Sequence, residues 1–67
     1  MDKAKYIEAI RDQGVEPIVT ENAIVIGDLE VAKVHGEKVT PITGASLMAN
    51  PIAASVACMA RLHCEQS

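Results

Sequence analysis

Residues 44–64 read GASLMANPIAASVACMARLHC, an apolar stretch with no charged side chain before Arg61. Within it Ile52, Val56 and Met59 recur at helical spacing and form one stripe along a helix, continued by His63. The opposite side carries alanine and cysteine, where an ordinary surface helix carries charged residues. We therefore expect a helix that is covered on most of its circumference, which is more cover than one small sheet provides.

The start of this helix is marked by Asn50-Pro51. Asparagine is a favourable N-cap. Proline suits the first helical position, because an N–H at that position would make no hydrogen bond within the helix. We expect the helix to run from residue 51 to about residue 63, with residues 65–67 frayed. Because a residue before proline avoids helical angles, residues 45–49 are expected to form a separate turn or a short helical piece.

Upstream, residues 15–43 change to the period of two that is typical of strands. Four short apolar runs follow one another in the order VEPIVT, AIVI, LEVAKV and KVTPI. The connections at Glu21-Asn22, Gly27-Asp28 and His35-Gly36 read as tight turns. Connections this short make neighbouring strands antiparallel, so the pattern predicts a meander.

Proline placement predicts the strand order. Pro17 and Pro41 fall in the first and fourth runs, and proline is tolerated in outer strands because it removes a ladder donor. The run AIVI is expected inside the sheet, with Ile24 and Ile26 facing a helix. The third run breaks its alternation near Ala32, which indicates a bulge or a weak register. Whether Val15–Thr20 joins the sheet is left open, so three or four strands are expected.

The chain begins with a helix predicted over residues 3–13. Asp2 can cap it, Tyr6, Ile7 and Ile10 share one face, and Gly14 suits the position just past the end. The sequence therefore predicts one α+β domain over residues 1–67. It consists of an N-terminal helix, a three- to four-stranded antiparallel meander and a C-terminal helix packed on the sheet.

The composition of the chain limits the classes of function that it can have. The chain has 67 residues, a formal net charge of −3 and Tyr6 as its one aromatic residue. So short a chain with so little aromatic surface is marginally stable alone, which favours assembly. Its basic residues are scattered, so no nucleic-acid partner is expected. No signal peptide is visible and two cysteines make no disulfide framework, so a reducing cytoplasm is the expected compartment.

Residues 39–60 carry no charge, so they are a candidate for a membrane-spanning segment. The Asn50-Pro51 pair lies near the middle of this stretch, and Gly, Ser, Thr and Ala dilute its hydrophobicity. A spanning helix needs about 20 predominantly apolar residues. We therefore expect a buried helix and no membrane partner.

Cys58, His63 and Cys64 are the residues that could hold a metal or act as a thiol site. Zinc needs four ligands in a tetrahedron, or three and a water, whereas Cys58 and Cys64 lie about 120° apart around a helix. No C-x-x-C spacing is present. Both thiols are expected to be reduced and metal-free, with no cofactor in the protein.

Thr43, Gly44 and Ser46 could bind a small ligand or an anion, because free N–H groups at a helix start attract phosphate or carboxylate. The stretch lacks a lysine and matches no phosphate-binding motif, so a plain glycine turn is favoured.

Asp28, Glu30 and His35 could do acid–base work if they converged. Asp28 and His35 lie at opposite ends of one predicted strand, so no enzymatic activity is expected. Met48 and Met59 could form an adaptable contact surface, although core filling is the favoured interpretation.

The predicted function is therefore that of a non-enzymatic structural or interaction protein, acting by self-association or as an accessory subunit of a larger assembly. With the Ile52–Val56–Met59 stripe on the sheet, the small residues on the other flank are left uncovered. The expected interface of a homodimer therefore consists of Ala53, Ala57, Ala60 and Cys64. The alternatives are a small-ligand or anion-binding module at Gly44–Ser46 and, as a weaker one, a thiol or metal protein using Cys58, His63 and Cys64.

Overall fold

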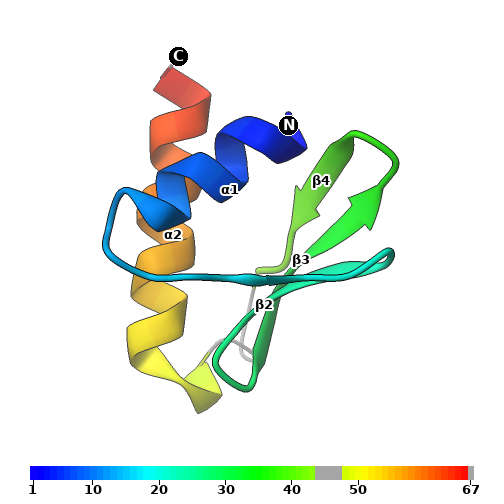
Figure 1. Cartoon of the computed structure of the whole chain (residues 1–67). Helices are drawn as coiled ribbons and strands as arrows, with labels where there is room; N and C mark the ends of the chain where they lie inside the picture. Colours follow the sequence, from blue (N-terminus) through cyan, green and yellow to red (C-terminus); the bar gives the residue numbers. More distant parts are fainter. Residues whose placement is uncertain (44–47, 67) are drawn as a thin grey trace.

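The computed structural model describes residues 1–43 and 48–66 and has two helices crossing on one face of an antiparallel sheet (Figure 1). In chain order the elements are α1 (Lys3–Arg11), β1 (Ile18–Val19), β2 (Ala23–Ile26), β3 (Leu29–His35), β4 (Lys38–Pro41) and α2 (Pro51–Gln66). The sheet has four strands in the order β1-β2-β3-β4, which is a meander. The predicted α+β class and its element order are confirmed.

The first apolar run does join the sheet, but only with two residues. Ile18 pairs with Val25 and Val19 with Ile24, so β1 is a short outer strand. Pro17 directly precedes β1, and Pro41 ends the other outer strand, β4. Both prolines therefore lie at the sheet's edges, where a missing N–H removes no central hydrogen bond.

The predicted irregularity near Ala32 is a register shift between β2 and β3. Ile24 is opposite Ala32 while Val25 is opposite Glu30, so Val31 is the extra residue. Alternation would turn one of two neighbouring residues outward, yet Val31 and Ala32 are both fully buried. The bulge thus lets β3 bury two consecutive apolar side chains.

The two hairpins inside the sheet turn at glycines. Gly27 and Gly36 both have φ of 65°, a left-handed conformation that glycine adopts without a steric penalty. The second turn lies one residue later than predicted, because His35 still pairs with Lys38.

Both helices begin at their predicted caps. The Asp2 carboxylate accepts from the Lys5 backbone N–H at 3.2 Å, and Asn50 Oδ1 accepts from the Ala53 N–H at 3.2 Å. α1 ends at Arg11, two residues earlier than predicted, whereas α2 continues to Gln66. The fraying predicted for residues 65–67 is therefore wrong for residues 65 and 66, which belong to α2. An ion pair between Arg61 and Glu65, one turn apart, supports this last part of the helix.

The start of the chain lies along the outer edge of β4. The Lys3 N–H donates to the Glu37 carbonyl at 2.9 Å, and the Val39 N–H donates to the Met1 carbonyl at 2.8 Å. These bonds connect the beginning of α1 to the sheet and cover part of an edge that would otherwise be open.

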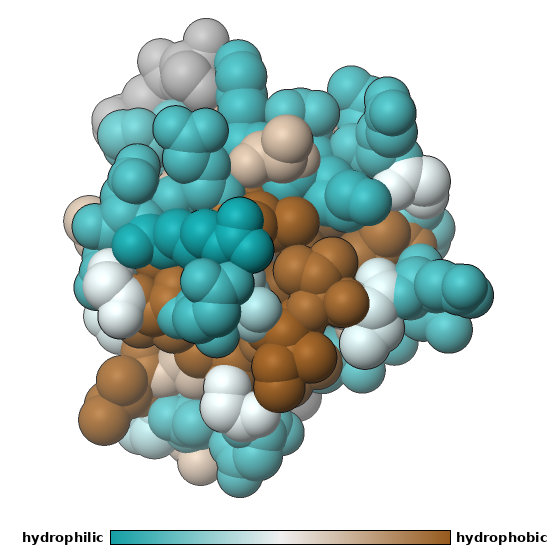
Figure 2. Space-filling view, in the orientation of Figure 1, coloured by the Kyte–Doolittle hydropathy of each residue, from teal (hydrophilic) through white to brown (hydrophobic). Residues whose placement is uncertain are grey.

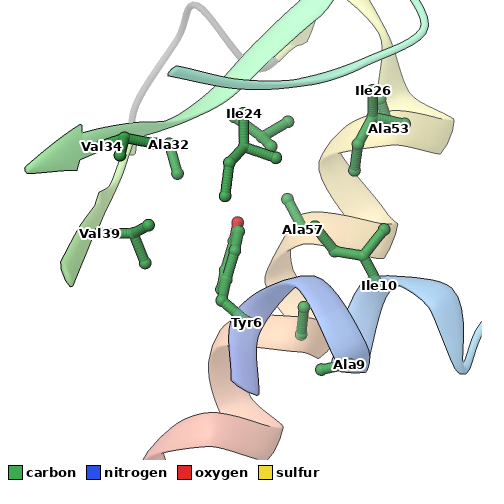
Figure 3. Packing of buried hydrophobic residues seen from close by; sticks show 12 residues of the cluster. Tyr6, Ala9, Ile10, Ile24, Ile26, Ala32, Val34, Val39, Ala53 and Ala57 are labelled. Carbon is green, nitrogen blue, oxygen red and sulfur yellow. The ribbon is translucent and has the colours of Figure 1, made fainter. Parts of the chain in front are cut away.

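The core lies between the helices and the sheet, and it fixes the rotation of α2 about its axis. In Figure 3 the Tyr6 ring stands between α1 and the sheet, Ile24 lies beyond its hydroxyl, and Ala53 of α2 lies beside Ile26. Ile24 and Ile26 are buried, as predicted. Among the described residues, no helix combines the length and the hydrophobicity needed to cross a membrane.

The predicted face of α2 is wrong. Ala53, Ala57 and Ala60 are buried at 1%, 4% and 1% exposure, whereas Ile52 and Met59 are 79% and 56% exposed. The sheet was the expected neighbour of the large side chains of α2, but α1 crosses α2 and is its main contact (Figure 1). Alanine allows two helix backbones to approach closely, so the small side chains face inward and the large ones outward.

Candidate interaction surface

Large apolar side chains line the outer side of α2. Ile52 is 79% exposed, Met59 56% and Leu62 44%, and Ser55 lies exposed between them. We call these four residues, at spacings of three, four and three, the outer stripe. Met48, just before α2, is 75% exposed. Figure 2 shows hydrophobic surface at lower left, where α2 begins.

The outer stripe has no charged neighbour within the first ten residues of α2. Residues 48–60 contain no acidic or basic side chain, and the first is Arg61, whose Nε donates to Glu65 at 2.9 Å. At the other end, Asp28 accepts a hydrogen bond from the Asn50 amide at 3.1 Å. The surface is therefore an uncharged strip bounded by polar groups at both ends.

Hydrogen bonds hold α2 so that the outer stripe faces away from the core. The Gln13 amide, just past α1, donates to the Ala9 carbonyl at 3.2 Å and to the Val56 carbonyl at 2.9 Å. The Asn50 side chain caps α2 and is bonded to the turn between β2 and β3. These contacts link α2 to α1 and to the sheet.

The residues predicted as the dimer interface lie on the inner side instead. Ala53, Ala57 and Ala60 belong to the buried core, and Cys64 is half-buried against it. The prediction that this ridge has no covering element in the chain is therefore wrong. The residues that sequence reasoning missed are Ile52 and Leu62, although the absence of charge around the helix already indicated a second covered face.

Met48 and Met59 are both exposed, so the interpretation of these residues as core filler is wrong. Exposed methionines form adaptable contact surfaces because their unbranched, polarisable side chains fit partners of varied shape. Their position beside and within the outer stripe is consistent with that role.

Cys58, His63 and Cys64 are not brought together into a site. Cys58 is exposed, and burial raises the pKa of the half-buried Cys64 thiol. Within the described part of the chain, no group of His, Cys, Asp and Glu is arranged to hold a metal ion. His63 and Cys64 border a shallow cavity of about 220 Å³ between the helices, with Lys5, Glu8, Ala9 and Asp12.

Of the predicted ligand-binding residues, Gly44 and Ser46 lie outside the described residues. Thr43 is exposed and borders a cavity of about 210 Å³ between the end of β4 and α2. The other residues of its lining are Tyr6, Pro41, Ile42, Ala57, Cys58 and Arg61.

Asp28, Glu30 and His35 remain separate. Asp28 is bonded to Asn50, Glu30 forms an exposed ion pair with Lys33 at 2.6 Å, and His35 lies at the far end of β3. The arrangement offers no common point at which these side chains could act on one substrate.

Tyr6 carries a buried hydroxyl that sequence reasoning did not identify. The residue is fully buried, and among the described residues its hydroxyl has no hydrogen-bond partner. Burial, the largest cause, raises the pKa of Tyr6 from 10.0 to about 12. Nothing in the sequence distinguishes this tyrosine from a core residue with a bonded hydroxyl.

A second apolar area lies on the outer strand β1, where Ile18 is 57% and Val19 40% exposed. Figure 2 shows hydrophobic surface in the middle of the view, over the segment that carries β1, with hydrophilic surface around it. This area is shorter than the outer stripe, because β1 has only two residues.

Comparison with family models, curated proteins and solved structures finds no match for this chain.

Proposed function

We propose that this protein is a non-enzymatic interaction protein of the cytoplasm that works by association through the outer stripe of α2. It acts as a homodimer or as an accessory subunit of a larger assembly. The observation that carries the proposal is the exposure of Ile52, Met59 and Leu62 on one uncharged side of a helix whose other side is buried. Contiguous exposed apolar surface of this kind marks protein contact sites.

The energetics support an association of modest strength. Burying one such side chain completely contributes about 1.5–3 kcal/mol. Because these side chains are already partly covered, the six that two copies bring together offer roughly 5–11 kcal/mol. Association costs about 4 kcal/mol or more in lost freedom, so only part of this gain appears as affinity. A dissociation constant of about 10–100 µM is the expected range for the stripe alone.

The test is the oligomeric state as a function of concentration. Sedimentation from about 5 µM to about 0.5 mM should show a reversible dimer, because this range brackets the expected dissociation constant. Even a dimer with a dissociation constant of about 0.1 mM, roughly −5.5 kcal/mol, would be populated at the upper end. Met59→Glu places a charge in the stripe and should leave a monomer at every concentration. Ile18→Glu is the matched control, since it makes the same kind of change at an equally exposed apolar residue on β1. A wild-type monomer throughout this range, with no partner retained on native purification, would exclude the proposal.

A second candidate is a small-ligand or anion-binding module using Thr43, Gly44 and Ser46. The observation that favours it is the cavity beside Thr43, which Arg61 also lines. Millimolar phosphate should then raise the midpoint of thermal unfolding, because a ligand that binds only the folded state stabilises it. Thr43→Val should remove that increase, and an increase that survives this change would point to another site.

A further inference from the structure

The outer stripe has the spacing of a helix-pairing seam. Residues 52, 55, 59 and 62 alternate steps of three and four, and this repeat keeps a line of side chains facing a neighbouring helix. From this we infer that its occupant is a second copy of the chain, with the two α2 helices packed antiparallel about a two-fold axis beside Cys58. The inference rests on the proposed function and adds the identity and direction of the partner helix.

The area available fits a small symmetric pair. α2 has 16 residues, which makes it about 24 Å long. Two helices paired along this length remove about 1,000 Å² of surface in total, near the lower limit for a specific interface. The stripe lacks charges that would oppose its own copy, and a two-fold axis sets one surface against itself.

Side-chain size favours the antiparallel direction. With the axis near residue 57, Ile52 of one copy lies level with Leu62 of the other. Ser55 then lies level with Met59, so the smallest residue of the stripe receives the longest one. A parallel pair would instead set Ser55 against Ser55 and leave a gap in the middle of the contact.

Electrostatics favour the same direction. An antiparallel pair brings the positive end of each helix dipole beside the negative end of the other. A parallel pair would place both Arg61–Glu65 ion pairs at the same end. These charges are exposed, so they choose between directions and add little to the affinity.

The antiparallel pair makes a particular prediction for the cysteines. Cys58 is exposed beside the outer stripe and one residue from its midpoint, so the two-fold axis sets both copies of Cys58 on the same flank of the pair near its middle. Cys64 lies half-buried on the inner side. Cys58 should therefore link two chains upon oxidation, and Cys64 should not.

The first experiment oxidises the Cys64→Ser variant with copper phenanthroline and oxygen at about 0.2 mM, a concentration above the expected dissociation constant. The oxidant accepts the two electrons and two protons released as two thiols form one disulfide. Most of the chain should run as a covalent dimer on a non-reducing gel, and several-fold less should do so at about 2 µM, because that concentration lies below the expected dissociation constant. The Cys58→Ser variant, with Cys64 retained, is the control and should stay monomeric on the gel.

The second experiment moves the cysteine to the ends of the stripe in a Cys58→Ser, Cys64→Ser background. Chains with Ile52→Cys should cross-link to chains with Leu62→Cys and not to themselves. Efficient self-linking of Ile52→Cys chains would show a parallel pair and overturn the inference while the proposed association stands. Sedimentation of the same background separates the two questions, because a monomer at all concentrations excludes self-association whatever the gels show.

Discussion

The inner and outer sides of α2 reverse the ordinary pattern of packing, because the small apolar side chains are buried and the large ones are exposed. The inner side buries Ala53, Ala57 and Ala60, whereas the outer side exposes Ile52, Met59 and Leu62. In an isolated domain the larger apolar residues gain more by burial, so they would be expected inside. Here the crossing of α1 over α2 requires small side chains on the inner side. The comparison teaches that hydrophobicity alone does not decide which side of a helix faces its own chain, because side-chain size determines how closely the neighbouring helix can approach.

The largest expected effect comes from placing a charge on the inner side. Ala57→Glu puts a carboxylate at a position with 4% exposure, beside Tyr6, where the cation one turn further on, Arg61, is already paired with Glu65. The free energy of unfolding should fall by about 3 kcal/mol or more, enough to unfold a chain of this size. Urea unfolding followed by circular dichroism measures this loss.

The matched control is Ser55→Glu, which makes a change of similar size on the outer side of the same helix. Measured on the dissociated chain at low concentration, it should alter the free energy of unfolding by less than about 0.5 kcal/mol. Equal losses in the two variants would mean that the two sides of α2 are not distinct.

The pKa of the Tyr6 hydroxyl depends on how completely water is excluded from the inner side of α2. Its pKa is raised from 10.0 to about 12 in the folded state, so folding favours the neutral phenol. The neutral hydroxyl makes its full contribution to the free energy of unfolding below pH 10. That contribution is lost as the pH rises toward 12, by roughly 2–3 kcal/mol in all. Tyr6→Phe should remove this part of the alkaline loss, and urea unfolding of both proteins between about pH 8 and about pH 12 measures it.

Tyr6→Phe also has an expected effect at neutral pH. Replacing an unbonded buried hydroxyl by hydrogen should leave the stability unchanged or raise it by about 1 kcal/mol, because no hydrogen bond is lost. A clear loss of stability at pH 7 would contradict the absence of a partner for this hydroxyl.

A smaller effect is expected at the cap that orients α2. Asn50→Ala removes the bond from Asn50 Oδ1 to the Ala53 N–H and the bond to Asp28. The first is an N-cap worth about 1 kcal/mol, and the second is exposed and contributes less. Asp28→Ala loses only the second bond, so chemical denaturation of the two variants should rank Asn50→Ala as the more destabilised.

The smallest effect on stability is expected for truncation of the outer stripe. Ile52→Ala removes a side chain that is already 79% exposed, so the dissociated chain should lose less than about 0.5 kcal/mol. The same change should weaken dimerisation several-fold, because it removes a contact at each end of the antiparallel pair. An unchanged dimerisation constant would remove Ile52 from the interface.

Much of the local structure could be predicted because its causes are local. Asp2 and Asn50 cap their helices through neighbouring backbone N–H groups, and Gly27 and Gly36 occupy turns that need a positive φ. The bulge beside Ala32 was visible as a break in alternation, and the prolines marked the outer strands.

The rotation of α2 about its axis could not be predicted from the sequence. Periodicity placed Ile52 and Met59 on one side and Ala53 and Ala57 on another, but both sides are apolar. The choice between them depends on α1, more than forty residues away in sequence, which crosses α2 and is tied to Val56 by Gln13. The Tyr6 hydroxyl, which has no hydrogen-bond partner in the described part of the chain, has the same origin, since its surroundings are side chains from distant elements that meet only in the folded chain.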